Sequence, residues 1–342
     1  MKIGILSSGG DCPGINTAIR GIGKIAITHY NMEVIGLYGG FTGLINKDVI
    51  PLNDYSLSGI LNLGGTILGT SREKPFRKLL EDETDNKPQI IIKNYHDLEL
   101  DCLVCIGGNG TQKTAHKLSE LGLNIVGVPK TIDNDIWGTD ISFGFDTAVG
   151  IATDAIDRLH STASSHNRVM VIELMGHHAG WITLHAGMAG GADIILLPEL
   201  GYDITSITEA VLDRVKKGKK YSIIVVAEGI NIGEKNTKKY KHPASYIAEK
   251  IEKLTGIEAR ETVLGYVQRG GNPSAFDRVL ATRLGSYATE LIKEGKFGQM
   301  VCLKNDKITS IELSKVANKL KLVKPENDLI IQGKRMGISF GK

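Results

Sequence analysis

A short polar turn at residues 129–135 holds the side chains best suited to chemistry. It follows an apolar run at residues 125–128 and brings together Lys130, Thr131, Asp133 and Asp135. Phosphoryl transfer needs a carboxylate that accepts the proton of the attacking hydroxyl, and a cation or metal that offsets the charge on the moving group. A solvated turn would not require all four side chains. We call this segment the acidic turn, and it offers a candidate for each part of a phosphoryl transfer.

Three other loops are punctuated by glycine and could hold phosphates. The first glycine loop (residues 7–14) and the second glycine loop (residues 107–111) each follow an apolar run and precede a helical pattern, so backbone N–H groups can face an anion. Between them, residues 64–72 form the arginine loop, in which Arg72 could bridge phosphates with its planar guanidinium. Taken singly, such loops are more often ordinary turns, and neither G-x-G-x-x-G nor a Walker A pattern is present. Two glycine loops together favour a nucleotide.

The elements that must position these loops follow from apolar patterning. Short β-branched runs predict buried strands at residues 3–6, 33–37, 103–106, 125–128, 169–174, 194–197 and 223–226. Helical patterns lie between them, the clearest at residues 148–159, where apolar residues recur every three or four positions. This alternation predicts an α/β fold of two doubly wound lobes with mainly parallel sheets. In such sheets ligands bind beyond the carboxyl ends of strands, where the polar loops fall.

The length suggests two domains, because 342 residues exceed the usual scale of roughly 100 to 200 residues per domain. No Pro-rich linker or internal repeat marks a boundary. We place it near residue 140, with a nucleotide-binding lobe at residues 1–140 and a second lobe at residues 141–342. This prediction leaves open that part of the C-terminal region returns to the first lobe.

Composition argues against several classes of protein. Lys and Arg number 41 against 38 Asp and Glu, a net charge of +3 that predicts no nucleic-acid or membrane partner. No apolar run approaches the ~20 residues of a membrane span, and the run at residues 3–6 is too short for a secretory signal. Four scattered cysteines predict a reducing, cytoplasmic location. Cys102 and Cys105 form a C-x-x-C pattern, but their apolar surroundings favour core packing over redox chemistry.

Six motifs, in order and spacing, resemble the phosphofructokinase A family. They are S-G-G-D-x-P-G at 8–14, G-G-T-x-L-G-T-S-R at 64–72, G-G-N-G-T at 107–111, P-K-T-I-D-N-D at 129–135, M-G-H at 175–177 and G-Y-V-Q-R-G-G at 265–271. The resemblance covers almost the whole chain, whereas one such motif alone would be weak. It implies two α/β lobes around a central cleft. It also implies ATP-dependent 6-phosphofructokinase activity, which phosphorylates the 1-hydroxyl of D-fructose 6-phosphate to fructose 1,6-bisphosphate in glycolysis.

On the nucleotide side, the resemblance makes Asp133 the general base, with Lys130, Thr131 and Asp135 beside the transferring phosphoryl group. The implied nucleotide-binding residues are Gly10, Arg72, Glu73, Gly108, Asn109, Gly110 and Thr111. ATP is then a co-substrate, with Mg²⁺ near Asn109 and Asp135. Asn109 stands where many family members carry an aspartate, and an amide oxygen coordinates a metal more weakly than a carboxylate does.

On the sugar side, the resemblance implies a second set of contacts. The substrate-binding residues would be Thr131, Asp133, Arg168, Met175, Gly176, His177, Glu228, Arg260, Tyr266 and Arg269. In the family, Arg168 and Arg260 typically reach in from a neighbouring subunit, which implies a homotetramer of paired dimers. His177 and Tyr266 replace the arginine and histidine of the best-known bacterial members.

The phosphoryl donor is less tightly specified than the acceptor. Family members that use pyrophosphate tend to carry aspartate at the position of Gly110 together with lysine at that of Lys130, so this sequence has one mark of each donor. A carboxylate at 110 would crowd and repel a nucleotide phosphate, so Gly110 favours ATP. Pyrophosphate-dependent fructose 6-phosphate 1-phosphotransferase activity is the alternative.

Two classes outside the family's chemistry and one regulatory feature complete the alternatives. A Rossmann-type dehydrogenase would need the absent G-x-G-x-x-G pattern. A sugar-phosphate-binding protein without catalysis would not need the side chains of the acidic turn.

The regulatory feature lies elsewhere in the sequence. Residues 217–220 and Asp193 resemble parts of a bacterial effector site, while Lys24 and His160 replace arginines that are common there. A solvated basic turn explains residues 217–220 equally well.

Overall fold

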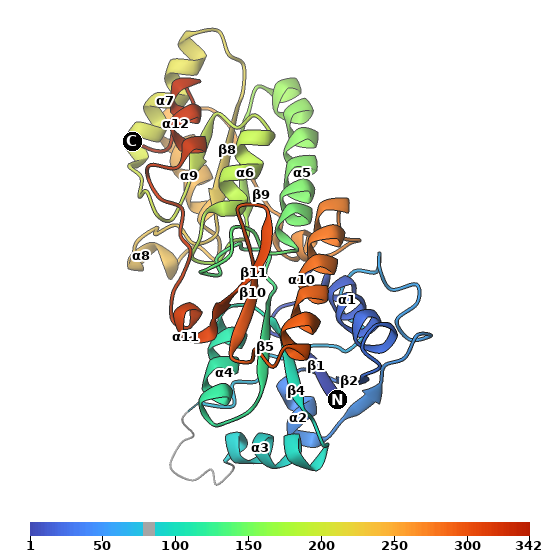
Figure 1. Ribbon diagram of the computed structural model, residues 1–342. Helices are drawn as coiled ribbons and strands as arrows, with labels where there is room; N and C mark the ends of the chain where they lie inside the picture. Colours follow the sequence, from blue (N-terminus) through green and yellow to red (C-terminus); the bar gives the residue numbers. More distant parts are fainter. Residues whose placement is uncertain (78–85) are drawn as a thin grey trace. The chain divides into compact units, whose positions relative to one another are not determined.

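The structure is a computed structural model that describes residues 1–77 and 86–342. The described chain forms two compact units (Figure 1). Unit 1 comprises Met1–Thr131, Ile136–Asp146 and Arg269–Leu320, and unit 2 comprises Ile132–Asp135, Thr147–Gln268 and Lys321–Lys342. The chain therefore passes between the units several times, and the acidic turn spans one of these passages.

Unit 1 is built on a seven-stranded sheet in the order β11-β10-β5-β4-β1-β2-β3. The strands are β1 (Lys2–Ser8), β2 (Glu33–Leu37), β3 (Val49–Pro51), β4 (Cys102–Gly107), β5 (Ile125–Pro129), β10 (Gln299–Lys304) and β11 (Lys307–Glu312). The five central strands, from β10 to β2, run parallel, while β3 and β11 pair antiparallel at the two edges. A mainly parallel sheet of this kind must be covered on both faces, which explains its continuous apolar runs.

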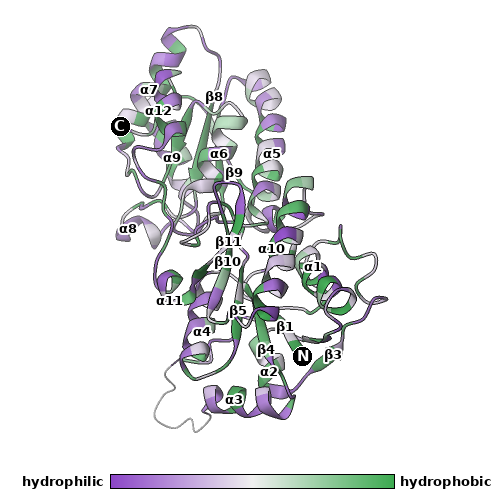
Figure 2. Ribbon diagram, in the orientation of Figure 1, coloured by the Kyte–Doolittle hydropathy of each residue, from purple (hydrophilic) through white to green (hydrophobic). Residues whose placement is uncertain are grey.

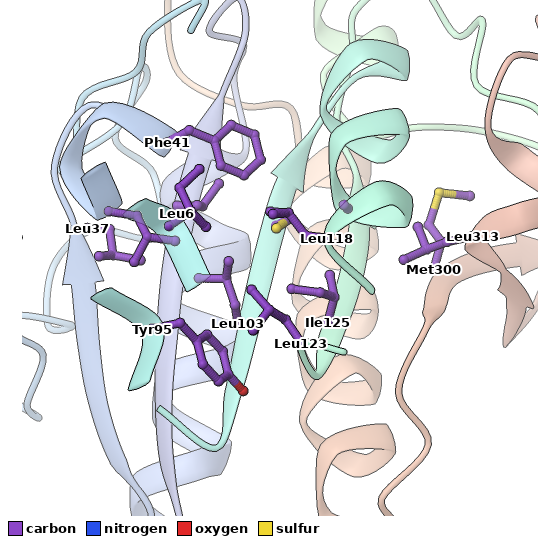
Figure 3. Packing of buried hydrophobic residues seen from close by; sticks show 14 of the residues in the cluster. Leu6, Leu37, Phe41, Tyr95, Leu103, Leu118, Leu123, Ile125, Met300 and Leu313 are labelled. Carbon is purple, nitrogen blue, oxygen red and sulfur yellow. The ribbon is translucent and has the colours of Figure 1, made fainter. Parts of the chain in front are cut away.

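Helices cover both faces of this sheet. On one face, α2 (Phe41–Asn46), α3 (Lys87–Asp97), α4 (Asn109–Glu120) and α11 (Leu313–Val316) contribute to one buried cluster with the strands. In Figure 3, Leu118 of α4 packs beside Leu103 and Ile125 of the sheet. On the other face, α1 (Ile15–Thr28) packs against α10 (Ala275–Lys293), which contacts β5 and β10.

Unit 2 has a four-stranded, fully parallel sheet in the order β7-β8-β6-β9. The strands are β6 (Val169–Leu174), β7 (Ile194–Leu196), β8 (Ser222–Ala227) and β9 (Ala259–Val263), and Figure 2 shows β8 as strongly hydrophobic. Helices α7 (Ile204–Lys216) and α9 (Pro243–Thr255) cover one face, and α6 (Trp181–Ala189) contacts β7 and β8. Gly187 lets α6 approach closely, because a Cβ there would lie 2.9 Å from the Ile195 side chain.

Four further elements complete the described chain. They are the long helix α5 (Phe145–His166), the short helix α8 (Glu234–Thr237), the 3₁₀ helix η1 (Gly265–Arg269) and α12 (Asp328–Arg335). The predicted helical stripe at residues 148–159 lies within α5. None of the helices in the described ranges is long and apolar enough to cross a membrane.

The predicted α/β architecture with mainly parallel sheets is confirmed. Each of the predicted strands coincides with an observed strand, although β7 ends at Leu196, one residue earlier than predicted. The predicted core packing of Cys102 and Cys105 is also confirmed, because both side chains are fully buried in β4. Strands β3, β9, β10 and β11 were not predicted. β3 and β11 are edge strands with exposed or half-buried residues, so their sequences lack a continuous apolar run.

Candidate active site

The sheet register of unit 1 brings the polar loops to one edge. Ser8 at the end of β1 lies opposite Gly107 at the end of β4, and Gly107 lies opposite Pro129 at the end of β5. Because the three strands are parallel neighbours, the first glycine loop, the second glycine loop and the acidic turn all begin at this edge. The sequence thus places its phosphate-binding candidates at the carboxyl end of a doubly wound sheet.

The carbonyl oxygen of Ser8 links these three segments. It accepts a hydrogen bond from the Lys130 ammonium group at 3.1 Å and another from the Thr111 hydroxyl at 3.2 Å. Lys130 also donates to the carbonyl oxygen of Gly10. Lys130 is only 2% exposed and Thr111 5% exposed, so these bonds are made away from water. Two side chains from different loops therefore fix the path of the first glycine loop.

The arginine loop is tied to the same segment. The amide of Gly9 donates to the Ser71 carbonyl at 2.9 Å, and the Thr70 hydroxyl donates to the Gly9 carbonyl at 2.7 Å. Gly9 has φ +89°, a left-handed conformation that glycine adopts without strain. Arg72, which follows directly, is exposed and makes no ion pair with any residue in the described ranges. Its guanidinium is thus available to an anionic ligand beside the first glycine loop.

Two other predicted site residues in unit 1, Glu73 and Arg269, are already engaged within the protein. The carboxylate of Glu73 lies 3.1 Å from the ammonium group of Lys87 at the start of α3. Arg269, predicted on the sugar side, belongs to unit 1 and donates to the Asp11 carbonyl at 3.1 Å. A Cβ at Gly10 would lie 2.9 Å from the Arg269 guanidinium, so a larger residue there would make this arginine shift.

The start of α4 fits a phosphate group. Gly108 is the N-cap and provides no side-chain cap, so the first N–H groups of the helix, from Asn109 onward, lack an intrahelical partner. A Cβ at Gly110 would meet no atom within 4 Å, which means open space beside the first turn. Oriented N–H groups, the positive end of the helix dipole and this space suit a polyphosphate.

The residues also fit a magnesium ion of the kind that accompanies a nucleotide. Among the residues that the structure describes, no group of three or more His, Cys, Asp or Glu side chains could hold a metal by itself. Mg²⁺ commonly takes one or two protein ligands and completes its shell with phosphate oxygens and water. Asn109 at the first turn of α4 and Asp135 in the acidic turn are oxygen donors of that type.

The acidic turn is held at both ends. Its Thr131 carbonyl accepts a hydrogen bond from the Ser142 hydroxyl at 2.9 Å in unit 1. In unit 2, Lys321 donates from its side chain to Asn134 and from its backbone to Asp135, both at 2.8 Å. Asn134 has φ +52°, which gives the turn its sharp reversal. The Asp133 side chain in this turn is half-buried.

Unit 2 contains a pocket of about 550 Å³ that gathers four of the predicted sugar-side residues. Met175, His177, Glu228 and Tyr266 all line it. The Glu228 carboxylate accepts hydrogen bonds from the amides of Gly176 at 3.2 Å and His177 at 2.8 Å. His177 has φ +52°, a conformation uncommon for a residue with a side chain and one that often marks functional sites.

The two remaining predicted arginines lie together, outside this pocket. Arg168 donates to Glu258 at 2.5 Å, and Arg260 pairs with the same carboxylate. The hydrogen bond from Arg168, followed by the charges of both arginines, lowers the pKa of Glu258. Arg260 also lies 3.4 Å from Glu252. The two arginines form one ion-pair cluster with Glu252 and Glu258, and neither arginine lines the 550 Å³ pocket of its own chain.

Comparison with known proteins identifies the chain's relatives. A family model described as Phosphofructokinase matches residues 2–292. The chain is 65% identical over 341 residues to ATP-dependent 6-phosphofructokinase 3 of Bacteroides thetaiotaomicron, with 100% of each chain covered. This chain belongs to the phosphofructokinase family. It is also 53% identical over 354 residues to ATP-dependent 6-phosphofructokinase of Spirochaeta thermophila, covering 99% of this chain and 97% of the relative.

Solved phosphofructokinase structures share the fold. The Pichia pastoris phosphofructokinase in the T-state has a TM-score of 0.83 and 31% identity, covering 92% of this chain, which spans 35% of the Pichia chain. A pyrophosphate-dependent phosphofructokinase from Nitrosospira multiformis gives a TM-score of 0.86 at 22% identity, covering all of this chain and 92% of that one. At that identity the second likeness concerns the fold alone.

Several residues of this phosphofructokinase site were missed by sequence reasoning. Gln112 is fully buried and donates to the carbonyls of Gly107 at 2.9 Å and Val128 at 3.1 Å, which joins the ends of β4 and β5. In unit 2, Lys241 and His242 line the pocket. A glutamine on a helical stripe gives no signal of such a bond. The cluster of lysines at residues 238–241 before Pro243 was a signal that could have been used.

Proposed function

We propose that this protein is an ATP-dependent 6-phosphofructokinase, which transfers the γ-phosphoryl group of ATP to the 1-hydroxyl of D-fructose 6-phosphate. The observation that carries the proposal is the 65% identity, over the full length of both chains, to a relative of that name. The hydrogen bonds at the Ser8 carbonyl support it, because they join two loops with phosphate-binding groups to the carboxylate-bearing acidic turn. The reaction belongs to glycolysis.

On the nucleotide side, Gly10, Gly108, Gly110 and the start of α4 bind the phosphates through backbone N–H groups. Arg72 adds a planar cation, Glu73 ties the end of the arginine loop to the start of α3 through Lys87, and Thr111 fixes the first glycine loop. Asn109 and Asp135 contribute oxygens toward Mg²⁺, which offsets the negative charge of the polyphosphate when it is bound. Most of the catalytic effect then comes from positioning and electrostatics.

Asp133 accepts the proton of the sugar's 1-hydroxyl as that oxygen attacks phosphorus. Thr131 lies two residues away and orients the transferring group, while Lys130 keeps the loops that bind the donor in place. The anchoring of the acidic turn by Ser142 and Lys321 limits the movement of the carboxylate. General-base catalysis by a positioned side chain contributes about 10² to 10⁴ in rate.

On the sugar side, Met175, Gly176, His177, Glu228 and Tyr266 form the wall of the 550 Å³ pocket that receives fructose 6-phosphate. Arg269, which donates a hydrogen bond to the first glycine loop, contributes a further contact to fructose 6-phosphate. Arg168 and Arg260 act on the sugar phosphate of a neighbouring subunit, which agrees with their absence from the pocket lining of their own chain. The proposed assembly is a homotetramer of paired dimers in the cytoplasm. We assign the nucleotide to unit 1 and the sugar to unit 2.

The alternative donor is pyrophosphate, and Gly110 is the residue that argues against it. The open space at Gly110 admits the α-phosphate of a nucleotide, whereas a carboxylate would repel it. The test is a donor comparison: purified protein is mixed with fructose 6-phosphate, Mg²⁺ and either ATP or pyrophosphate, and fructose 1,6-bisphosphate is measured. We expect product with ATP. Product with pyrophosphate alone would reverse the donor assignment, and no product with either donor would overturn the proposed function.

A further inference from the structure

The pocket of unit 2 contains a histidine whose ring is held by a buried carboxylate. The Nδ1 atom of His242 lies 3.0 Å from one oxygen of Glu173, and the other oxygen accepts a hydrogen bond from the Ala244 amide at 3.0 Å. The Glu173 side chain is 5% exposed, while that of His242 is 35% exposed. Both oxygens of the glutamate are thus engaged, and the orientation of the imidazole ring is fixed.

This arrangement determines what His242 can offer to a ligand. A carboxylate only accepts, so Nδ1 carries a proton and donates it to Glu173. The second ring nitrogen, Nε2, makes no hydrogen bond to any residue in the described ranges, and the residue lines the pocket. In the imidazolium form of the ring, Nε2 also becomes a donor.

Lys241, the preceding residue, supplies a permanent positive charge. Among the described residues that line the pocket, Lys241 is the single Lys or Arg. Its side chain makes no ion pair within the described chain, unlike the nearby Lys239, which lies 2.9 Å from Glu249. The pocket also contains Glu228, whose Oε1 atom is already bound to two backbone amides. A dianionic ligand in this pocket therefore finds a cation at Lys241 and an imidazole nitrogen without a protein hydrogen bond at His242.

We propose that Lys241 and His242 bind the phosphate group of the sugar phosphate from within the same chain, with Glu173 as the residue that positions the His242 ring. The inference rests on the proposed function, because that function supplies the phosphorylated sugar. It adds two specificity-determining residues to the site.

Steady-state kinetics of Lys241→Met test the proposal, with Lys238→Met as the matched control. Both lysines are exposed, but Lys238 does not line the pocket. We expect Lys241→Met to raise the KM for fructose 6-phosphate about tenfold, the equivalent of one charge-assisted hydrogen bond, with kcat and the KM for ATP little changed. Lys238→Met should behave as the wild type. An unchanged KM in Lys241→Met, or an equal change in Lys238→Met, would overturn the proposal.

The role of His242 is tested separately with His242→Gln, which keeps a polar side chain at this position of the pocket lining. We expect the KM for fructose 6-phosphate to rise about tenfold, with kcat and the KM for ATP little changed. An unchanged KM for fructose 6-phosphate would contradict a role for His242.

The positioning role of Glu173 has its own readout. Glu173→Gln keeps the shape of the side chain but removes the negative charge to which the His242 ring donates, so the KM for fructose 6-phosphate should rise while kcat stays close to that of the wild type. An unchanged KM would show that Glu173 only caps α9. These outcomes are distinct from failure of the proposed function, which would appear as a wild-type protein that forms no fructose 1,6-bisphosphate.

Discussion

The ammonium nitrogen of Lys130 lies 3.1 Å from the backbone carbonyl oxygen of Ser8. This contact joins the acidic turn after β5 to the first glycine loop after β1, across the intervening strand β4. Because Lys130 is 2% exposed, its charge is used in building the site, and its bonds to the Ser8 and Gly10 carbonyls hold the loop amides in place. A lysine that sequence reasoning placed beside the phosphoryl group therefore also has a structural task.

Replacing Lys130 should damage the nucleotide site and the fold together. In Lys130→Met the carbonyls of Ser8 and Gly10 lose their charged donor, so the loop can shift. Misplacement of a positioned group by about 1 Å can cost 10² in rate, and we expect kcat/KM for ATP to fall by about that factor. The free energy of unfolding should fall by about 1 to 3 kcal/mol. Denaturant unfolding and initial rates measure both effects.

The control for this variant is Lys113→Met, which removes an exposed lysine from α4 without touching the loops. It should keep the activity and stability of the wild type. A Lys130→Met protein that matched Lys113→Met in both measurements would refute the structural role of Lys130.

Donor choice should respond to a single substitution at the start of α4. In Gly110→Asp the new Cβ meets no atom within 4 Å, so the fold should be kept. A negative charge in the first turn also stabilises a helix by about 0.3 to 1 kcal/mol. The same charge repels a nucleotide phosphate, so the KM for ATP should rise at least about tenfold. Melting temperature and initial rates are the readouts.

Gly110→Asn separates charge from size at this position. It has nearly the same shape as the aspartate variant without its charge, so its KM for ATP should lie close to that of the wild type. If Gly110→Asp used ATP as well as the wild type does, the electrostatic argument for the donor would be wrong.

Much of this site could be predicted from the sequence, because its determinants are local. Continuous apolar runs define the central strands, and polar loops directly after β1, β4 and β5 mark the ligand edge of the sheet. The bonds that join the loops could not be predicted, since Lys130 and Ser8 are 122 residues apart in the chain. The same holds for Gln112, which joins β4 to β5. Only the strand order brings such residues together.

Sharing of the sugar-phosphate site between subunits can be tested by complementation. Asp133→Asn removes the general base, and Arg168→Ala removes an arginine that we propose acts on the neighbouring subunit. In a mixed pair with two-fold symmetry, one site combines both substitutions and the other has neither. Unfolding and refolding an equal mixture should therefore restore about a quarter of the wild-type activity. Activity no greater than that of the separate variants would argue for sites that lie within single chains.

The cysteines should be inert in the folded protein. Cys12, Cys102, Cys105 and Cys302 are all buried and free. Burial, the largest effect, raises the pKa of Cys12 to about 12 and that of Cys302 to about 11, and it raises the pKa values of Cys102 and Cys105 as well. A thiol-reactive dye at pH 8 should label no cysteine in the native protein and all four after denaturation. Rapid labelling of the native protein would contradict this burial.

The raised pKa values of the thiols also determine how the free energy of unfolding changes with pH. The native thiols keep their protons where unfolded thiols, with an ordinary pKa of 9.0, would release them. Their contribution to the free energy of unfolding is therefore full below about pH 9 and is lost as pH rises toward the native pKa values. The thiols should add no pH dependence to stability between pH 6 and 8.

The most direct measurement is the rate of phosphoryl transfer in Asp133→Asn, with the exposed Asp154→Asn on α5 as its control. Fructose 1,6-bisphosphate formation from ATP and fructose 6-phosphate gives kcat, and calorimetry gives the affinity for the sugar phosphate. We predict a kcat lower by about two to four decades in Asp133→Asn, with sugar-phosphate affinity retained, because only proton acceptance is lost. Asp154→Asn should match the wild type. A near-normal kcat in Asp133→Asn would contradict the assignment of the acidic turn as the catalytic centre.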